Sequence, residues 1–224
     1  MSGQLFKYLS SSIIKKQIMG VTGLLLCGFL ISHMLGNLLI IVGAEAFNHY
    51  AHALITNPLL YPAEAILAAI FLVHIFLAIK LTIENHQARP QKYFNKSKTG
   101  RGATFASSTM PYTGLIILIF LVKHLLDFKF GPVIEATYAG ITMRDLHQIV
   151  LDHFANPLNV AWYVFVMICL GIHVSHGFWS AFQSLGFNHP KYNCALKCGA
   201  QAFAIIIALG YSTIAIWSYL QGGN

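Results

Sequence analysis

Charged side chains are scarce in this sequence. Only 9% of the 224 residues are Asp, Glu, Lys or Arg, whereas 56% are hydrophobic. Ordinary soluble proteins carry about 25% charged residues, and so little charge cannot cover a water-exposed globule of this size. A soluble enzyme and a nucleic-acid-binding domain are therefore excluded, and most of the chain is expected to be solvated by lipid.

Motifs of the common soluble redox domains are also lacking. The sequence has no glycine-rich dinucleotide fingerprint and no Cys cluster suited to an iron–sulfur centre. Of the four cysteines, Cys27 and Cys169 lie inside apolar runs, and Cys194 and Cys198 lack the Cys-x2-Cys spacing of zinc and redox sites. Flavin and iron–sulfur chemistry are therefore not expected on this chain.

Long apolar runs are what the sequence has in abundance. A membrane span needs about 20 residues, and Pro, Gly and charged residues delimit five runs of that length. The runs cover residues 17–43, 62–83, 111–130, 158–183 and 199–220. We therefore predict an all-α, polytopic membrane protein whose residues 1–224 form one domain, a bundle of five transmembrane helices.

The connections between the spans carry fewer signals. Residues 47–54 and 142–150 are predicted to form short amphipathic helices at the outer interface, the second opened by a capping box of Thr142 and Asp145. Span three is expected to open at Pro111. We find no strand pattern and no convincing internal repeat.

Basic residues are distributed unevenly over these connections. On one side of the predicted bundle only Lys129 and Arg144 occur. The other side has Lys7, Lys15, Lys16, Arg89, Lys92, Lys96, Lys98, Arg101, Lys191 and Lys197. By the positive-inside rule, the N-terminus is expected in the cytoplasm and the C-terminus outside.

Histidines inside the spans are the most informative residues. His33, His74, His124 and His173 lie one on each of the first four spans, and His176 follows His173 by one turn. Ionisable side chains in hydrocarbon are costly and mark functional sites. One such histidine could be an interhelical hydrogen bond, but four on four different helices favour a shared purpose.

Depth sorts these histidines into two layers. At about 1.5 Å per residue, His33 and His124 fall near the outer face, and His74 and His173 fall near the cytoplasmic face. An imidazole pair at one depth suits a six-coordinate haem, because the porphyrin supplies four nitrogens and the protein two. Zinc would need three or four ligands at one level. We therefore predict two haems b (iron protoporphyrin IX) that transfer electrons, with His176 as the alternative ligand to His173.

Four segments around the histidines carry a family resemblance. They are Ser32-His33-Met34-Leu35-Gly36-Asn37, Leu72-Val73-His74-Ile75, Val122-Lys123-His124-Leu125-Leu126-Asp127-Phe128 and His173-Val174-Ser175-His176-Gly177-Phe178-Trp179-Ser180, with Ala88-Arg89-Pro90 in the inner loop. The sequence resembles the dihaem cytochrome b anchor subunit of succinate dehydrogenase and fumarate reductase, in the type with one five-helix anchor. The resemblance implies His33 with His124 at the outer haem, and His74 with His173 at the inner haem.

The resemblance further implies a role in a bacterial cytoplasmic membrane. The anchor would hold a flavoprotein subunit and an iron–sulfur subunit on the cytoplasmic face, and these would oxidise succinate or reduce fumarate. The anchor itself would exchange electrons with a quinone, which is menaquinone in many relatives. Some relatives carry a glutamate two residues before the span-four ligand, where this chain has Gly171, so a proton path through that side chain is not expected.

Other polar residues are candidates for the quinone and the haem propionates. Glu64 is a candidate for proton exchange with quinone, or else an interfacial carboxylate favoured by a helix N-terminus. Arg144 and Lys123 are candidate partners of the outer-haem propionates. The alternatives are a solvated Arg144 and a Lys123 that pairs with Asp127 four residues later.

Two other functions compete with this interpretation. One is a haem b subunit of another quinol-reactive respiratory complex, although the type with two ligands on each of two helices is not matched by any span. The other is a proton-coupled transporter that uses the histidines as a relay, which predicts broken helices and further ionisable residues at mid-membrane. A structural anchor that had lost its haems would not need all four histidines.

Overall fold

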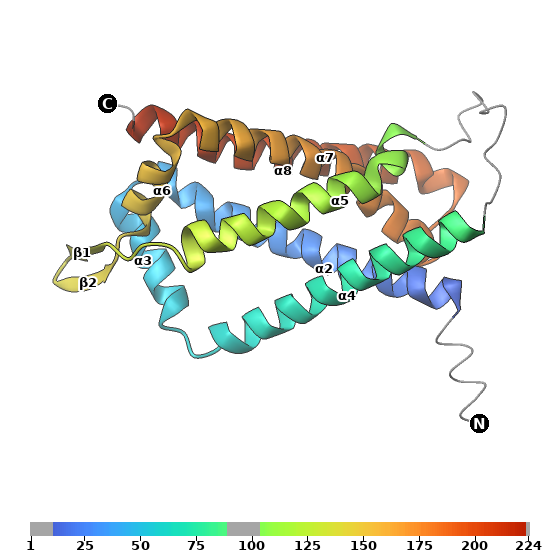
Figure 1. The fold of residues 1–224 in the computed structure, drawn as a ribbon, viewed down its shortest axis with the longest axis horizontal. Helices are drawn as coiled ribbons and strands as arrows, with labels where there is room; N and C mark the ends of the chain where they lie inside the picture. Colours follow the sequence, from blue (N-terminus) through green and yellow to red (C-terminus); the bar gives the residue numbers. More distant parts are fainter. Residues whose placement is uncertain (1–10, 89–103, 223–224) are drawn as a thin grey trace.

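The computed structural model describes residues 11–88 and 104–222. Five long helices run side by side in an elongated bundle (Figure 1). They are α2 (Ser12–Leu38), α4 (Leu60–Gln87), α5 (Phe105–His124), α7 (Pro157–Ser184) and α8 (Pro190–Gly222). All five are long and apolar enough to cross a membrane, so the prediction of a largely helical chain with five candidate spans is confirmed.

Short elements gather at one end of the bundle. They are the 3-10 turn η1 (Leu39–Ile41), α3 (Ala44–Ile55), β1 (Glu135–Tyr138), β2 (Ile141–Arg144) and α6 (Leu146–Phe154). We call this the hairpin end; the last turn of α8 lies there too, while α2 begins at the opposite, N-terminal end (Figure 1). Of the basic residues used to predict orientation, six lie outside the described residues, as do Arg89 and Pro90 of the inner-loop motif.

Local capping explains where two of the long helices begin. The Ser11 hydroxyl accepts a hydrogen bond from the backbone N–H of Ile14 at the start of α2. Asn156 accepts one from Leu158 before α7, whose first residue is a proline. Both devices satisfy N–H groups that have no partner inside the helix. Span four therefore begins within one residue of its predicted start.

Span three begins earlier than predicted. Pro111 lies inside α5, which starts at Phe105 after the N-cap Thr104. The expectation that Pro111 opens the helix was wrong, because membrane helices tolerate proline where neighbouring groups satisfy the freed backbone. At its other end α5 continues into a single turn of π-helix, η2 (Leu125–Lys129).

The connection after span three contains strands that were not predicted. Strands β1 and β2 form an antiparallel hairpin with Glu135 opposite Arg144. Ala139 and Gly140 at its tip have φ of 49° and 81°, as a two-residue type I′ turn requires. Each strand has only four residues, which is too short for alternation to stand out in the sequence.

Both predicted amphipathic helices are present, as α3 and α6. The capping box was assigned wrongly, because Thr142 lies in β2. The helix is instead capped by Asp145, whose side chain accepts a hydrogen bond from the Gln148 N–H at 3.0 Å. Pairing of Thr142 with Thr137 in the hairpin removes it from the helix.

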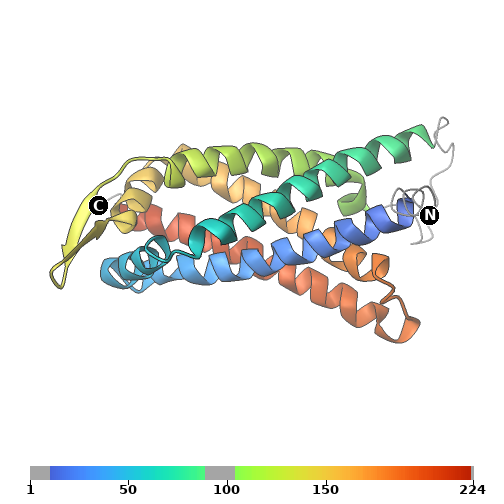
Figure 2. The same ribbon diagram turned by 90° about the horizontal axis from the view of Figure 1, so that it is seen from below.

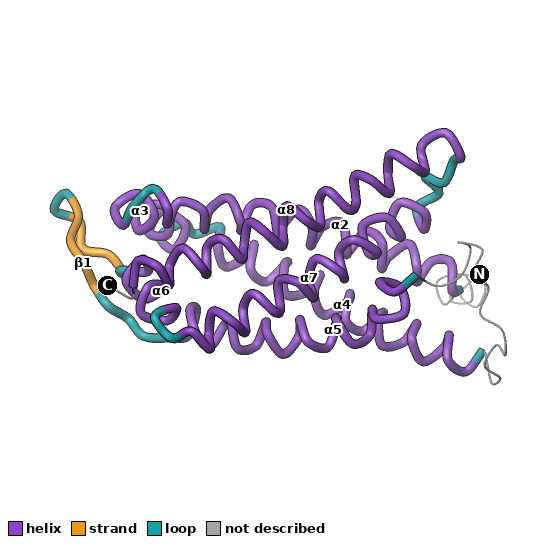
Figure 3. The backbone as a smooth tube through the Cα atoms, turned by 90° about the horizontal axis from the view of Figure 1, so that it is seen from above, coloured by secondary structure: helices purple, strands orange, loops and turns teal. Residues whose placement is uncertain are grey.

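Helix α7 lies at the centre of the bundle. It packs against α8, α2 and α5, and α2 packs in turn against α4. Helices α5 and α8 lie on opposite sides of the bundle when it is seen from below and from above (Figures 2 and 3). The least buried spans are α4, in which only Leu77 and Leu81 are buried, and α5, in which only Thr113 is buried. Four helices that carry histidines therefore surround one interior.

Candidate functional site

The predicted outer pair, His33 and His124, meets across the bundle. His33 projects from α2 and His124 from the last residue of α5, and their ring centroids are 5.9 Å apart with the ring planes at 87°. A metal held between two imidazoles by bonds of about 2 Å would place the ring centres roughly 6 Å apart. The spacing of the two rings therefore fits a pair of axial ligands.

An aromatic side chain one turn earlier orients each of these rings. Phe29 stacks on His33 with centroids 5.1 Å apart, and Phe120 stacks on His124 at 5.4 Å. The interplanar angles are 17° and 27°. Stacking restricts rotation of the imidazoles, so each ring is held in place before any ligand binds.

A network of polar side chains lies beside the Nδ1 atom of His124. Its Nδ1 atom is 3.4 Å from the Tyr163 hydroxyl, which donates to Asp127 Oδ2 at 3.1 Å. Lys123 donates to both Asp127 oxygens at 2.9 Å, and His153 Nε2 is 3.6 Å from the same carboxylate. Since the single Tyr163 proton is used by Asp127, the hydroxyl oxygen accepts from the Nδ1–H of His124. The lone pair of that ring is therefore on Nε2, the atom that a haem iron needs.

His33 has a different neighbour. The Asn37 amide donates to the His33 carbonyl oxygen at 2.7 Å, and its Nδ2 atom lies 3.4 Å from His33 Nδ1. An amide nitrogen can only donate, so toward Nδ1 it offers no acceptor of the kind that Tyr163 offers to His124. Among the described residues, no charged side chain hydrogen-bonds to His33.

The predicted inner pair, His74 of α4 and His173 of α7, also faces one interior. Each of these imidazoles has a buried threonine hydroxyl beside its Nδ1 atom. Thr22 Oγ1 lies 3.1 Å from His74 Nδ1, and Thr113 Oγ1 lies 3.1 Å from His173 Nδ1. The structure therefore brings the rings of His33 and His124 together, and it places a threonine of a neighbouring helix beside each inner histidine.

His176 remains a neighbour of His173. The two side chains interact electrostatically, one turn apart on α7. In the described part of the chain, His173 is the one of the two whose Nδ1 atom has a threonine hydroxyl beside it. This arrangement favours His173 over His176 as the partner of His74.

The other predicted site residues are engaged at the hairpin end. Glu64 is partly exposed and forms an ion pair with Lys129, and Lys123 pairs with Asp127 as the alternative interpretation anticipated. Arg144 Nη2 donates to the carbonyl oxygens of Phe128 at 2.8 Å and Pro132 at 2.7 Å.

Arg144 is consequently not a freely solvated cation. Its Nε atom is buried without a hydrogen-bond partner among the described residues, and burial lowers the pKa of the guanidinium. A buried donor of this kind is available to an acceptor group that is not part of the chain.

Sequence reasoning missed the groups that contact Nδ1. Thr22, Thr113 and Tyr163 were not singled out. A signal for the threonines exists, because a Thr-Gly pair precedes His33 and His124 at the same distance in spans one and three. The two segments correspond to each other in a way that was not predicted from the sequence.

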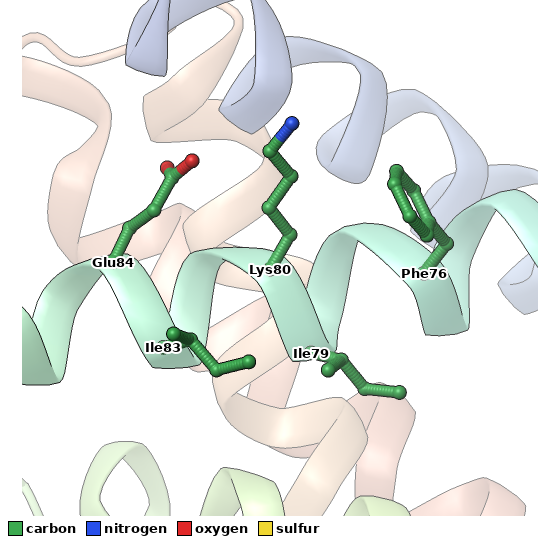
Figure 4. A pocket seen from close by; sticks show the side chains of 5 residues that line it. All are labelled: Phe76, Ile79, Lys80, Ile83 and Glu84. Carbon is green, nitrogen blue, oxygen red and sulfur yellow. The ribbon is translucent and has the colours of Figure 1, made fainter.

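Other surfaces offer no comparable site. Among the described residues, no three His, Cys, Asp or Glu side chains converge as a metal-binding group. A shallow surface depression on α4 is lined by Phe76, Ile79, Lys80, Ile83 and Glu84 (Figure 4). In it Glu84 pairs with Lys15 of α2, and the Lys80 ammonium lies 5.8 Å from the centre of the Phe76 ring. All the residues that line the depression belong to a single helix.

Comparison with protein-family models, curated proteins and solved structures finds no match to this chain.

Proposed function

We propose that this chain is a dihaem cytochrome b subunit that carries electrons through a bacterial cytoplasmic membrane. The observation that supports it most directly is the outer pair, whose rings lie 5.9 Å apart with the Nε2 lone pair of His124 free. A second pair on two further spans, with a hydroxyl beside each Nδ1, supports a second site of the same kind.

The residues fit haem better than a metal ion bound by protein alone. Each pair offers two nitrogens, and the four remaining positions of an octahedral iron would come from a porphyrin. Bound haem b supplies one-electron chemistry by alternating between ferric and ferrous iron. Because His33 and His124, like His74 and His173, would fill both axial positions, the protein leaves no position for oxygen and favours electron transfer.

Within this proposal the chain anchors a succinate:quinone oxidoreductase. The flavoprotein and iron–sulfur subunits would dock on the N-terminal end of the bundle, in the cytoplasm, where the predicted excess of Lys and Arg lies. Menaquinone would react near the hairpin end, on the outer side. There Glu64 is the candidate for proton exchange, and Lys123 and Arg144 are the candidates for binding the propionates of the outer haem.

Optical spectroscopy of the purified protein tests this function. Oxidised and dithionite-reduced spectra, with pyridine haemochrome quantitation, should give two low-spin haems b per chain. An exposed histidine provides a matched control, since His86→Ala should leave both haems in place. A folded protein with no haem, or with one, contradicts the proposal. In membranes that contain the whole complex, succinate should reduce at least one haem.

A further inference from the structure

The inner histidines are oriented by a feature that occurs twice in the chain. We propose that Thr22 and Thr113 are matched positioning residues of the inner haem, each accepting a hydrogen bond from the Nδ1–H of one ligand and so presenting its Nε2 to the iron. This inference rests on the proposed function. It assigns to α2 and α5 a role at the inner site although their own histidines belong to the outer one.

The proton of each threonine hydroxyl is already committed. Thr22 Oγ1 donates to the backbone carbonyl oxygen of Ile18 at 2.9 Å, and Thr113 Oγ1 donates to that of Thr109 at 3.1 Å. A hydroxyl has one proton and two lone pairs, so toward the imidazole it can only accept. His74 and His173 must therefore be protonated on Nδ1, which leaves the Nε2 lone pair free for a metal.

The glycine that follows each threonine lets the imidazole of the neighbouring histidine lie close to the helix backbone. A Cβ added to Gly23 would lie 3.4 Å from His74 Cε1, and a Cβ added to Gly114 would lie 3.5 Å from His173 Cε1. An alanine Cβ at either position would be in van der Waals contact with the ring, so the imidazole lies close against the helix at both glycines. Each Thr-Gly step thus combines one acceptor with one flat contact, and it defines both the rotation and the tautomer of the imidazole.

The two steps occupy equivalent places in a repeated segment. Thr22-Gly23-Leu24 corresponds to Thr113-Gly114-Leu115, and Phe29 and His33 correspond to Phe120 and His124 at the same spacing. In each copy the Thr-Gly pair contacts a histidine of the following span. Accordingly, α2 packs against α4 and α5 packs against α7. Each copy of the repeat therefore contains one proposed outer ligand and one Thr-Gly pair that contacts a proposed inner ligand.

Loss of a hydroxyl has a defined physical consequence. An Nδ1–H bond to an acceptor raises the basicity of the ligand, and removing such a partner typically costs about 10- to 100-fold in metal affinity. A more basic ligand favours ferric over ferrous iron. If the loss were tenfold and confined to the ferric form, the midpoint potential would rise by about 59 mV for one electron.

The test uses Thr22→Val and Thr113→Val in the full-length protein. Val keeps the shape of Thr but removes the acceptor. The readouts are haem content per chain and potentiometric titration of both haems followed optically and by electron paramagnetic resonance. We expect a raised potential or about tenfold weaker retention at the inner haem only, with wild-type values restored in Thr22→Ser and Thr113→Ser.

Thr82 provides a matched control. Its Oγ1 donates to the Ala78 carbonyl oxygen at 2.7 Å on an exposed face of α4, so Thr82→Val removes the same kind of hydroxyl away from the histidines and should change neither haem. If a Val variant does not fold, Thr22→Ala or Thr113→Ala removes the same acceptor with a smaller side chain.

Two outcomes separate this inference from the proposed function. A wild-type protein without haem refutes the function. A wild-type protein with two haems, combined with Val variants whose inner haem keeps its content and potential or whose outer haem changes instead, refutes only the role of the threonines.

Discussion

The two histidine layers present the same ligand with different partners. In the inner layer both Nδ1 atoms face neutral threonine hydroxyls at the same distance, 3.1 Å. In the outer layer the partner of His33 is the Asn37 amide, and that of His124 is Tyr163, whose hydroxyl donates to the Asp127 carboxylate. One layer is thus symmetric and uncharged, and the other is asymmetric and linked to a charge.

Position in the bundle explains this difference. Ionised groups are expensive in hydrocarbon, so the inner layer uses hydroxyls whose protons are satisfied within their own helices. His124 ends α5, and the π-helical turn that follows carries Asp127 near the hairpin end. There Lys123 and Tyr163 compensate the carboxylate. A haem in each layer would accordingly experience different electrostatics although the axial ligands are chemically identical.

Replacing one histidine of either layer should have the largest effect, because it should remove the haem of that layer only. His74→Ala should lose the inner haem and keep the outer one, and His33→Ala should do the reverse, because in the proposed function each pair would hold one iron. Pyridine haemochrome quantitation would then give one haem per chain in place of two.

A third variant checks which histidine of α7 is the ligand. His176→Ala should retain both haems, because His173 is the one of the two whose Nδ1 atom has a threonine hydroxyl beside it. Loss of a haem in His176→Ala with both haems retained in His173→Ala would reverse that assignment. Loss of both haems in a folded His74→Ala protein would contradict two independent layers.

Neutralising Asp127 should change the properties of the outer layer and leave those of the inner layer unchanged. Asp127→Asn weakens the charged hydrogen bonds to Lys123 and Tyr163, and because Lys123 is partly exposed we expect a loss of about 1–2 kcal/mol of stability. Thermal unfolding in detergent measures this loss. Potentiometry should show a shift in the outer haem and none in the inner one.

Asp152→Asn is the matched control for this change. Asp152 is exposed and accepts a hydrogen bond from Gln148 on α6, so its replacement should leave both haems and nearly all of the stability unchanged. An Asp127→Asn protein whose inner haem shifts as much as the outer one would show that the two layers are not electrostatically separate.

The smallest expected effect is the pH dependence of stability that arises from histidines at the hairpin end. Burial lowers the pKa of His147 from its ordinary value of 6.5, although the Asp145 carboxylate acts in the opposite direction. Below about pH 6.5 the unfolded chain therefore binds more protons than the folded one, and stability falls with acidification toward the folded-state pKa. Burial lowers the pKa of His153 as well, which adds to the same trend.

His147→Gln should reduce this acid sensitivity without changing either haem. Unfolding midpoints in detergent at neutral pH and at mildly acidic pH measure the slope. His189→Gln, at an exposed position near the N-terminal end, should keep the wild-type slope. An unchanged slope in His147→Gln would mean that other groups at the hairpin end dominate the titration.

The sequence by itself determined the five spans and the depth of each histidine. The length of an apolar run follows from bilayer thickness, and a helix satisfies its own backbone, so both can be predicted from one segment at a time. Where short-range signals compete, sequence reasoning failed: Pro111 does not open its helix, and Thr142 lies in a strand instead of capping one.

Only the tertiary structure decided what each imidazole touches. Depth follows from counting residues along one helix, but the contact between Thr22 and His74, or between Tyr163 and His124, depends on how two helices are rotated about their axes. That rotation is the joint result of the packing of α7 against α2, α5 and α8, and no single span contains it.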